Sequence, residues 1–240
     1  MEKFDQFLDK TKAKKATITK KNSKNKNTDV GKGKTLAQNM FMNAPLIHWL
    51  KPNLNLNKRL NLLQIWGINL SKDSWSSLSE WISNALSLET LAINKCSLPF
   101  EFLESLEDSL RNWENCQTLD LRGNNIPDSM GGLIVRIMQA QTEKRDSIIW
   151  VYSIRNEYPE HIDRIGLKSI ILRRNKLGKH FMQSLSRWVQ HDDYMRHIDI
   201  SYNRISSDLI KTFWNQMKEN SSLVSLEMHG NTGYSSIVQK

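Results

Sequence analysis

The residue types that carry catalytic chemistry are present in this chain but scattered. Six histidines are spread along its length, and no Ser, His and Asp share a recognisable nucleophile motif. His191, Asp192 and Asp193 stand together, but their place between an expected helix and an expected strand is typical of a polar turn. Cys96 and Cys116 lack metal-ligand spacing and fall where small buried side chains are expected. We therefore predict no enzymatic activity, no cofactor and no metal site.

A phosphate-binding loop is suggested by Gly33, Lys34 and Thr35, but the wider pattern fails. That motif requires a glycine five residues before Gly33, and Thr28 stands there instead. It also requires a preceding strand, whereas a lysine-rich segment precedes it here. The sequence thus gives no support for nucleotide binding or for a small-molecule substrate.

The elements that must position any functional side chains follow from an internal repeat. The pattern L-x-x-L-x-L-x-x-N/C-x-L occurs six times, starting at Leu60, Leu88, Cys116, Leu167, Met195 and Leu223. Four of the five spacings between these starts equal 28, and the remaining one equals 51. A 28-residue period predicts an α/β leucine-rich-repeat solenoid in which each short strand precedes a helix. We expect a ribonuclease-inhibitor-like horseshoe with parallel strands on its concave face.

The residue type at each position of the repeat can be explained physically. The apolar residues on either side of one polar position alternate inward on a short strand. The Asn side chain of later repeats is expected to bond the turning backbone beneath the next coil. Apolar residues at helical spacing follow each strand, and Trp75, Trp81, Trp188 and Trp214 are expected in the core between helices and sheet. Residues 38–59 are expected to form a helix that caps the first coil.

The outward-facing positions of the strands carry side chains suited to protein recognition. Partner-binding candidates there are Trp66, Arg122, Arg173, Arg174 and Tyr202. Trp, Tyr and Arg are the residue types enriched at interface hot spots. An alternative is that Arg122 and Arg173 pair across the strands with Asp120 and Asp199 as a solvated ladder.

The spacing of 51 contains an insertion, residues 141–166, within the predicted repeat domain of residues 60–240. Neither Gly nor Pro occurs between Ala140 and Tyr158, so the third helix is expected to continue into the insertion and to end at Pro159. The insertion matches, without gaps, the pattern Q-T-x-[RK]-R, W-x-x-S-[LI]-R, P and G-L-x-x-I-x-L. The matching residues are Gln141, Thr142, Lys144, Arg145, Trp150, Ser153, Ile154, Arg155, Pro159, Gly166, Leu167, Ile170 and Leu172.

This segment resembles the insertion in the 78-kilodalton centrosomal protein family, whose members are leucine-rich-repeat proteins of centrioles and ciliary basal bodies. The resemblance implies a non-enzymatic scaffold at the centriole, basal body or axoneme, acting in cilium assembly with centriolar, ciliary or microtubule partners. It adds Lys144, Arg145, Trp150 and Arg155 as partner-binding candidates. The alternative role for Trp150 is to pin the insertion onto the solenoid.

The basic character of the chain is concentrated at its N-terminus. Residues 1–34 hold eleven lysines and four acids, a net charge of +7, whereas residues 35–240 hold 23 basic and 21 acidic side chains. We expect residues 1–37 to be a disordered tail. It is suited to an acidic surface such as tubulin, nucleic acid or an anionic membrane, or serves only as a solubilising tail. The lysines of this electrostatic tail include Lys12, Lys14, Lys15, Lys20, Lys21, Lys24 and Lys26.

Location and an alternative function follow from the same features. No run of eighteen apolar residues and no apolar signal segment occur, so we expect a cytoplasmic protein of the cytoskeleton, at the centrosome, basal body or cilium. The alternative function is a nucleic-acid-associated or other cytosolic binding module that uses the lysine tail as its phosphate-binding arm. The nearly neutral repeat region and the lack of a nucleic-acid motif disfavour that alternative.

Overall fold

The computed structural model describes residues 60–232, except positions 86, 112 and 219. Within this range six strands pair in parallel, in chain order, as one sheet. The strands span Leu62–Trp66 (β1), Thr90–Asn94 (β2), Thr118–Asp120 (β3), Ser169–Ile171 (β4), His197–Asp199 (β5) and Ser225–Glu227 (β6). A parallel sheet combined with helices confirms the predicted α/β class. The predicted tail and capping segment lie outside the described residues.

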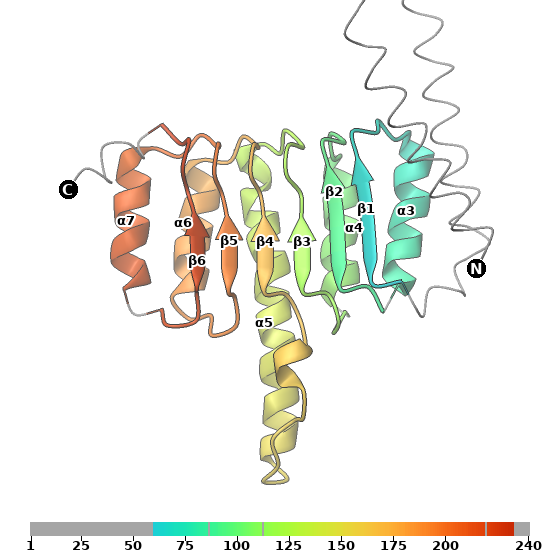
Figure 1. Ribbon diagram of the computed structural model, residues 1–240, viewed down its shortest axis with the longest axis vertical. Coiled ribbons are helices and arrows are strands. Elements are labelled where there is room, and N and C mark those ends of the chain that lie inside the picture. Colours follow the sequence, from blue (N-terminus) through green and yellow to red (C-terminus); the bar gives the residue numbers. More distant parts are fainter. Residues whose placement is uncertain (1–59, 86, 112, 219, 233–240) are drawn as a thin grey trace, which may run out of the picture. The chain divides into compact units, whose positions relative to one another are not determined.

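A helix follows each strand from β1 to β5, and these helices all lie on one side of the sheet (Figure 1). The α-helices span Lys72–Asn84 (α3), Phe100–Arg111 (α4), Gly131–Ser153 (α5), Lys179–Val189 (α6) and Ser207–Met217 (α7). Two short 3-10 helices, Asp128–Met130 (η2) and Ile162–Arg164 (η3), flank α5 and its return segment. Among the helices of the described ranges, none has the length and apolar character needed to cross a membrane.

Equivalent repeat positions pair across neighbouring strands. The partners of the first strand position are Leu62↔Thr90, Thr90↔Thr118, Thr118↔Ser169, Ser169↔His197 and His197↔Ser225. The residue numbers of these partners differ by 28 at four of the steps and by 51 between β3 and β4, where the insertion lies. The outward-facing positions therefore form columns that run across the sheet.

The core lies between the sheet and the helices. The inward-facing strand residues Leu91, Leu119, Ile170 and Ile198, which pair across the sheet, are fully buried. Burying one such side chain contributes roughly 1.5–3 kcal/mol, so this layer is the main source of stability. The prediction that Trp214 belongs to this core is wrong, since its side chain is 46% exposed. No further helix follows α7 within the described residues, so that face of α7 is uncovered.

Helix α5 continues into the insertion, as predicted, and projects beyond the other helices (Figure 1). It ends at Ser153, however, and not at Pro159. Asn156 adopts a left-handed conformation with φ 55°, and the N–H of Glu157 donates to the carbonyl oxygen of Tyr152 at 3.1 Å. A left-handed Asn with this bonding pattern is a common way to terminate a helix. The helix therefore ends at this Asn cap, several residues before Pro159.

Candidate protein-interaction surfaces

The insertion is fastened to the repeats by two buried polar side chains of α5, Gln141 and Arg145. The Nε2 of Gln141 donates to the carbonyl oxygen of Leu110, and its Oε1 accepts the N–H of Leu167 at 3.2 Å. The guanidinium of Arg145 donates to the carbonyl oxygens of Ile165 and Leu167, the latter at 2.9 Å. These bonds tie α5 to the preceding helix and to the segment that returns toward β4.

Gly166 is required at the point where these two side chains meet the returning chain. Its φ is +69°, and an added Cβ would lie 2.9 Å from Arg145 Nε and 3.1 Å from Gln141 Oε1. Arg145 also lies over the ring of Tyr194, with 4.8 Å from Cζ to the ring centroid. Burial lowers the pKa of Arg145 to about 10. The prediction that Arg145 contacts a partner is wrong, because this guanidinium is buried and bonded within the chain.

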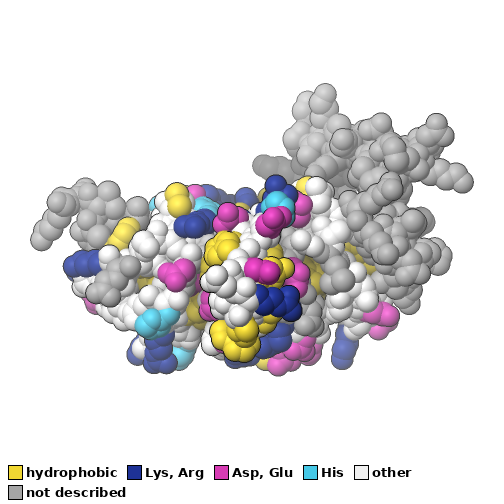
Figure 2. Space-filling model, turned by 90° about the horizontal axis from the view of Figure 1, so that it is seen from below, with side chains coloured by type: hydrophobic (Ala, Val, Ile, Leu, Met, Phe, Trp, Pro, Cys, Tyr) yellow, Lys and Arg dark blue, Asp and Glu magenta, His cyan; other side chains and the backbone are white. Residues whose placement is uncertain are grey.

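The far end of the insertion exposes a cluster of large apolar side chains. We define the insertion tip as Trp150, Val151, Tyr152, Ile154 and Tyr158, which are 64%, 43%, 37%, 65% and 70% exposed. Figure 2 views the molecule from the side toward which the insertion points, and hydrophobic side chains gather at the centre of that face among charged ones. Soluble proteins rarely expose a contiguous apolar patch that does not bind something.

The remaining candidates in the insertion differ in their surroundings. Arg155 is exposed beside the tip. The Nζ of Lys144 lies 3.3 Å from Glu114 Oε1, so this lysine forms an ion pair at the base of the insertion. The alternative role for Trp150, pinning the insertion to the solenoid, is wrong because most of its side chain is in solvent.

A second surface lies at the C-terminal ends of the strands. We define the strand-end surface as Trp66, Lys95, Arg122, Arg173, Arg174 and Tyr202. The Nζ of Lys95 lies 4.9 Å from the ring centroid of Trp66. The Cζ atoms of Arg173 and Arg174 lie 4.6 and 5.3 Å from the ring centroid of Tyr202. Each aromatic ring of this surface thus has at least one cationic side chain close to it.

The backbone of this surface adopts left-handed conformations. One residue just past each strand has a positive φ, namely Gly67, Lys95, Gly123, Arg174, Tyr202 and Gly230. Glycine adopts this conformation readily, whereas a residue with a side chain pays an energetic cost of about 1–2 kcal/mol. Three coils nevertheless place Lys, Arg or Tyr at this position, and all three side chains belong to the strand-end surface.

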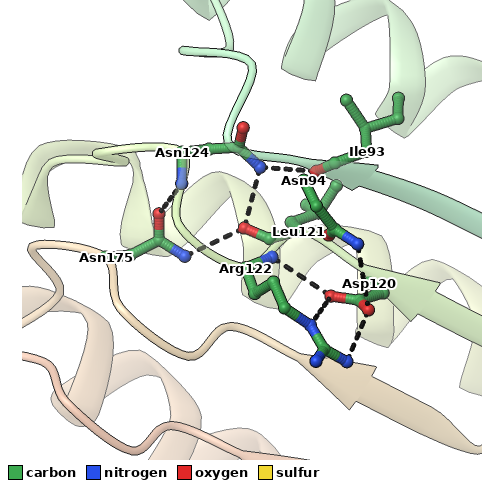
Figure 3. A network of polar contacts seen from close by, with 7 residues as sticks. All are labelled: Ile93, Asn94, Asp120, Leu121, Arg122, Asn124 and Asn175. Carbon is green, nitrogen blue, oxygen red and sulfur yellow. Dashed lines mark hydrogen bonds and ion pairs between the residues drawn. The ribbon is translucent and has the colours of Figure 1, made fainter. Parts of the chain in front are cut away.

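The acidic residues near this surface are largely satisfied within the chain. Asp120 is buried and lies 2.7 Å from Nη2 of Arg122 in its own coil (Figure 3). This hydrogen bond raises the pKa of Arg122. Asp199 is also buried and accepts the N–H and the hydroxyl group of Ser201. The predicted ladder is confirmed in one part only: Arg122 pairs with Asp120, although within its own coil, whereas Arg173 lies over Tyr202.

Beneath the strand-end surface, a ladder of buried Asn side chains holds successive coils in register. Asn175 Oδ1 accepts the N–H of Asn124, and its Nδ2 donates to the carbonyl oxygen of Leu121 (Figure 3). The same side chain also accepts the N–H of Ile126 and donates to the carbonyl oxygen of Leu172. The predicted role of Asn is confirmed, but each side chain reaches back to the preceding coil, not forward to the next. This network makes the turns that carry the cations rigid.

Sequence reasoning did not single out Lys95, a member of the strand-end surface, or His229, which packs beside that surface. The ring of His229 packs edge-on against Tyr202, with centroids 5.1 Å apart. The sequence signal for Lys95 was its alignment with the glycines at positions 67 and 123, which implies an unusual backbone conformation. The tail lysines lie outside the described residues.

Two further kinds of site, a metal centre and a reactive thiol, were considered in the sequence and can be compared with the described ranges. Within them, no group of three or more His, Cys, Asp or Glu is placed to hold a metal ion. Cys96 and Cys116 are buried free thiols, as predicted. Burial raises the pKa of both thiols, that of Cys116 to about 12, so neither is activated as a nucleophile.

Comparison with known proteins supports the resemblance seen in the insertion. No protein-family model matches the chain. The centrosomal protein of 78 kDa from Mus musculus is 24% identical over 183 residues, which is 76% of this chain. The chain spans 23% of the length of that relative.

Two solved structures are similar to this chain in the path of the backbone. The tropomodulin C-terminal domain from Caenorhabditis elegans has a TM-score of 0.53 and 12% identity, and the match covers 72% of this chain and 92% of that one. The structure of leiomodin-1 actin-binding site 2 has a TM-score of 0.48 and 13% identity, covering 63% and 76% of the two chains. At these identities the tropomodulin match supports the fold alone.

Proposed function

We propose that this chain is a non-enzymatic protein-interaction scaffold of the centrosome. In this proposal its 28-residue repeats build a horseshoe-like leucine-rich-repeat solenoid over residues 60–240, with residues 38–59 as a cap and residues 1–37 as a basic tail. The solenoid acts as a rigid support, and the insertion tip and the strand-end surface contact other proteins. Its partners are centriolar, ciliary or microtubule components.

The observation that carries this proposal is the insertion tip. Trp150, Ile154 and Tyr158 are each more than 60% exposed at the end of a helix that projects beyond its neighbours. Leaving such side chains in water forfeits the roughly 1.5–3 kcal/mol that burial of each would contribute. A bound partner recovers this free energy, and a tryptophan of this kind is a typical interface hot spot.

The proposed location depends on similarity to the mouse centrosomal protein and on the insertion motif. The motif residues divide into two groups in the structure. Gln141, Arg145 and Gly166 hold the insertion in place, whereas Trp150, Ile154 and Arg155 are exposed at or beside its tip. The motif therefore includes both the residues that hold the insertion in place and residues exposed at its tip. This favours the same docking role in this chain as in the centrosomal family, at the centriole or basal body.

Localisation in a ciliated cell tests this proposal. The tagged full chain and a version that begins at residue 35 are expressed at low level and imaged beside centriole and axoneme markers. We expect both to concentrate at basal bodies, because the docking side chains lie within residues 60–232. Loss of the centrosomal signal only in the shorter version would show that the lysine tail, and not the repeat domain, directs localisation. A nuclear or diffuse signal from both would contradict the centrosomal proposal.

A further inference from the structure

Two guanidinium groups share one aromatic ring on the strand-end surface. Arg173 and Arg174 lie 4.6 and 5.3 Å from the ring centroid of Tyr202, which itself packs against His229. Stacking holds the planar guanidinium groups in place while their N–H donors remain available. Neither arginine forms an ion pair with a carboxylate of the described residues. The pair is therefore arranged to bind an anion from outside.

The surrounding charges define which anions fit. Asp120 and Asp199 occupy the neighbouring column on the strands, where they are buried and bonded to Arg122 and Ser201. Glu227 lies in the same column, with its Oε2 4.0 Å from Nδ1 of His229. A nucleic-acid strand, which carries a phosphate at every step, meets repulsion from this acidic column. A peptide can place carboxylates on the cations and leave neutral residues over the acids.

The backbone at these residues favours a role for the side chains other than stabilising the fold. Arg174 and Tyr202 have φ values of 58° and 54°, in the region where glycine is unstrained. Glycine occupies the same column position in three other coils, at residues 67, 123 and 230. Strained non-glycine residues cluster at ligand-binding sites, where function compensates their cost.

We propose that the strand-end surface binds an acidic peptide segment of a partner protein, with Asp or Glu carboxylates held by Arg173 and Arg174. The pair of guanidinium groups forms bidentate, charge-assisted hydrogen bonds to carboxylates. Trp66 and Lys95 form a second aromatic–cation pair at the other end of the surface, which suits an extended peptide that crosses several coils. This inference rests on the proposed protein-binding function but not on the centrosomal location.

Peptide binding to the full chain tests the inference. The probe is a fluorescein-labelled ten-residue peptide in which glutamate alternates with glycine, and the same peptide with glutamine in place of glutamate is the neutral reference. Fluorescence anisotropy at moderate salt gives Kd for the parent, Arg174→Gln, Tyr202→Gly and Arg187→Gln. Arg187 is an exposed arginine on α6, outside the strand-end surface, so its variant removes the same charge elsewhere. Tyr202→Gly suits its left-handed backbone, and thermal unfolding verifies that every variant is folded.

We expect Arg174→Gln and Tyr202→Gly each to weaken glutamate-peptide binding about tenfold, whereas Arg187→Gln changes Kd less than about twofold. Equal binding by all variants would overturn the inference and assign the peptide to the lysine tail. Tighter binding of a ten-nucleotide single-stranded RNA that is lost in the same two variants would also overturn it, in favour of nucleic acid. A chain that passes this test but is absent from centrosomes would keep the inference and contradict only the proposed location.

Discussion

The ring of Tyr202 fills the space that a side chain would need at Gly230, the residue at the equivalent position in the next coil. A Cβ added to Gly230 would come within 2.6 Å of the ring Cδ1 and 2.8 Å of Cε1. Lys95 has the same relationship to Gly123, whose added Cβ would lie 2.9 Å from Lys95 Cγ. Tyr202 and Lys95 therefore each depend on a glycine in the following coil for their position.

The first prediction compares Gly230→Ala with Gly67→Ala. Both glycines have a left-handed φ, +72° and +66°, so each substitution costs about 1 kcal/mol of backbone strain. Only Gly230→Ala also displaces a ring, because no described atom lies within 4 Å of the Cβ position at Gly67. We expect Gly230→Ala to lower the free energy of unfolding in urea by about 1 kcal/mol more than Gly67→Ala. Equal losses would mean that the Tyr202 ring moves away freely.

The second prediction concerns the anchor of the insertion. Arg145→Met keeps much of the side-chain volume but leaves the carbonyl oxygens of Ile165 and Leu167 without this donor. We expect a loss of roughly 2–4 kcal/mol in unfolding free energy and faster hydrogen exchange of the return segment. Arg155→Met, in the same insertion but exposed, is the control and should change stability by less than about 0.5 kcal/mol. Similar exchange rates in the two variants would refute the anchoring role of Arg145.

The third prediction is a pH dependence at Asp128, which caps the N-terminus of α6. Burial alone raises the pKa of Asp128, but the N–H groups of Phe181, His180 and Gly178, together with the His180 side chain, more than offset it. The folded-state pKa is therefore below its ordinary value. Stability from this carboxylate is present above the unfolded-state pKa of about 4 and is lost as pH falls through the folded-state pKa.

Asp128→Asn tests this cap. We expect it to be about 1 kcal/mol less stable than the parent at pH 7, in line with the loss of a charged helix cap. The difference should shrink as pH falls below about 4, since a protonated Asp128 resembles Asn. Urea unfolding at pH 7, 5 and 3 measures the gap. A gap that stays constant across this range would contradict the proposed role of the charge.

The fourth prediction concerns the Asn ladder. Asn175→Ala leaves the buried N–H groups of Asn124 and Ile126 without their acceptor, and two carbonyl oxygens without their donor. We expect a loss of roughly 2–4 kcal/mol in unfolding free energy. Asn84→Ala removes an exposed Asn that bonds only its own helix and should cost less than about 1 kcal/mol. A comparable loss in both variants would show that the ladder contributes little.

The repeat pattern made the strands, their pairing and the core predictable, because each inward position recurs in every coil and has one way to be buried. Ile93, Leu119 and Ile170 lie where the pattern places them. The end of α5 was mispredicted because the left-handed Asn156 stops the helix by its own local bonds, before Pro159 can. No periodicity encodes such a cap.

The candidate surfaces were less predictable than the fold. Arg145 and Arg155 are the same residue type ten positions apart in one insertion, yet one is buried and the other exposed. The difference arises from the path of the return segment, whose carbonyl oxygens receive the Arg145 guanidinium. Lys95 belongs to the strand-end surface because its backbone is left-handed. The only sign of this conformation in the sequence is that Lys95 aligns with glycines of other repeats.

The central claim is that the chain is a centrosomal scaffold that docks through the insertion tip. Its most direct test compares the localisation of tagged Trp150→Ala with that of Trp214→Ala, a matched change at an exposed tryptophan on α7. Circular dichroism first establishes that both variants fold like the parent. We predict that Trp150→Ala lowers enrichment at centrosomes about tenfold, as removal of an interface hot spot would, while Trp214→Ala leaves it unchanged. Full centrosomal enrichment of the folded Trp150→Ala chain would contradict the account.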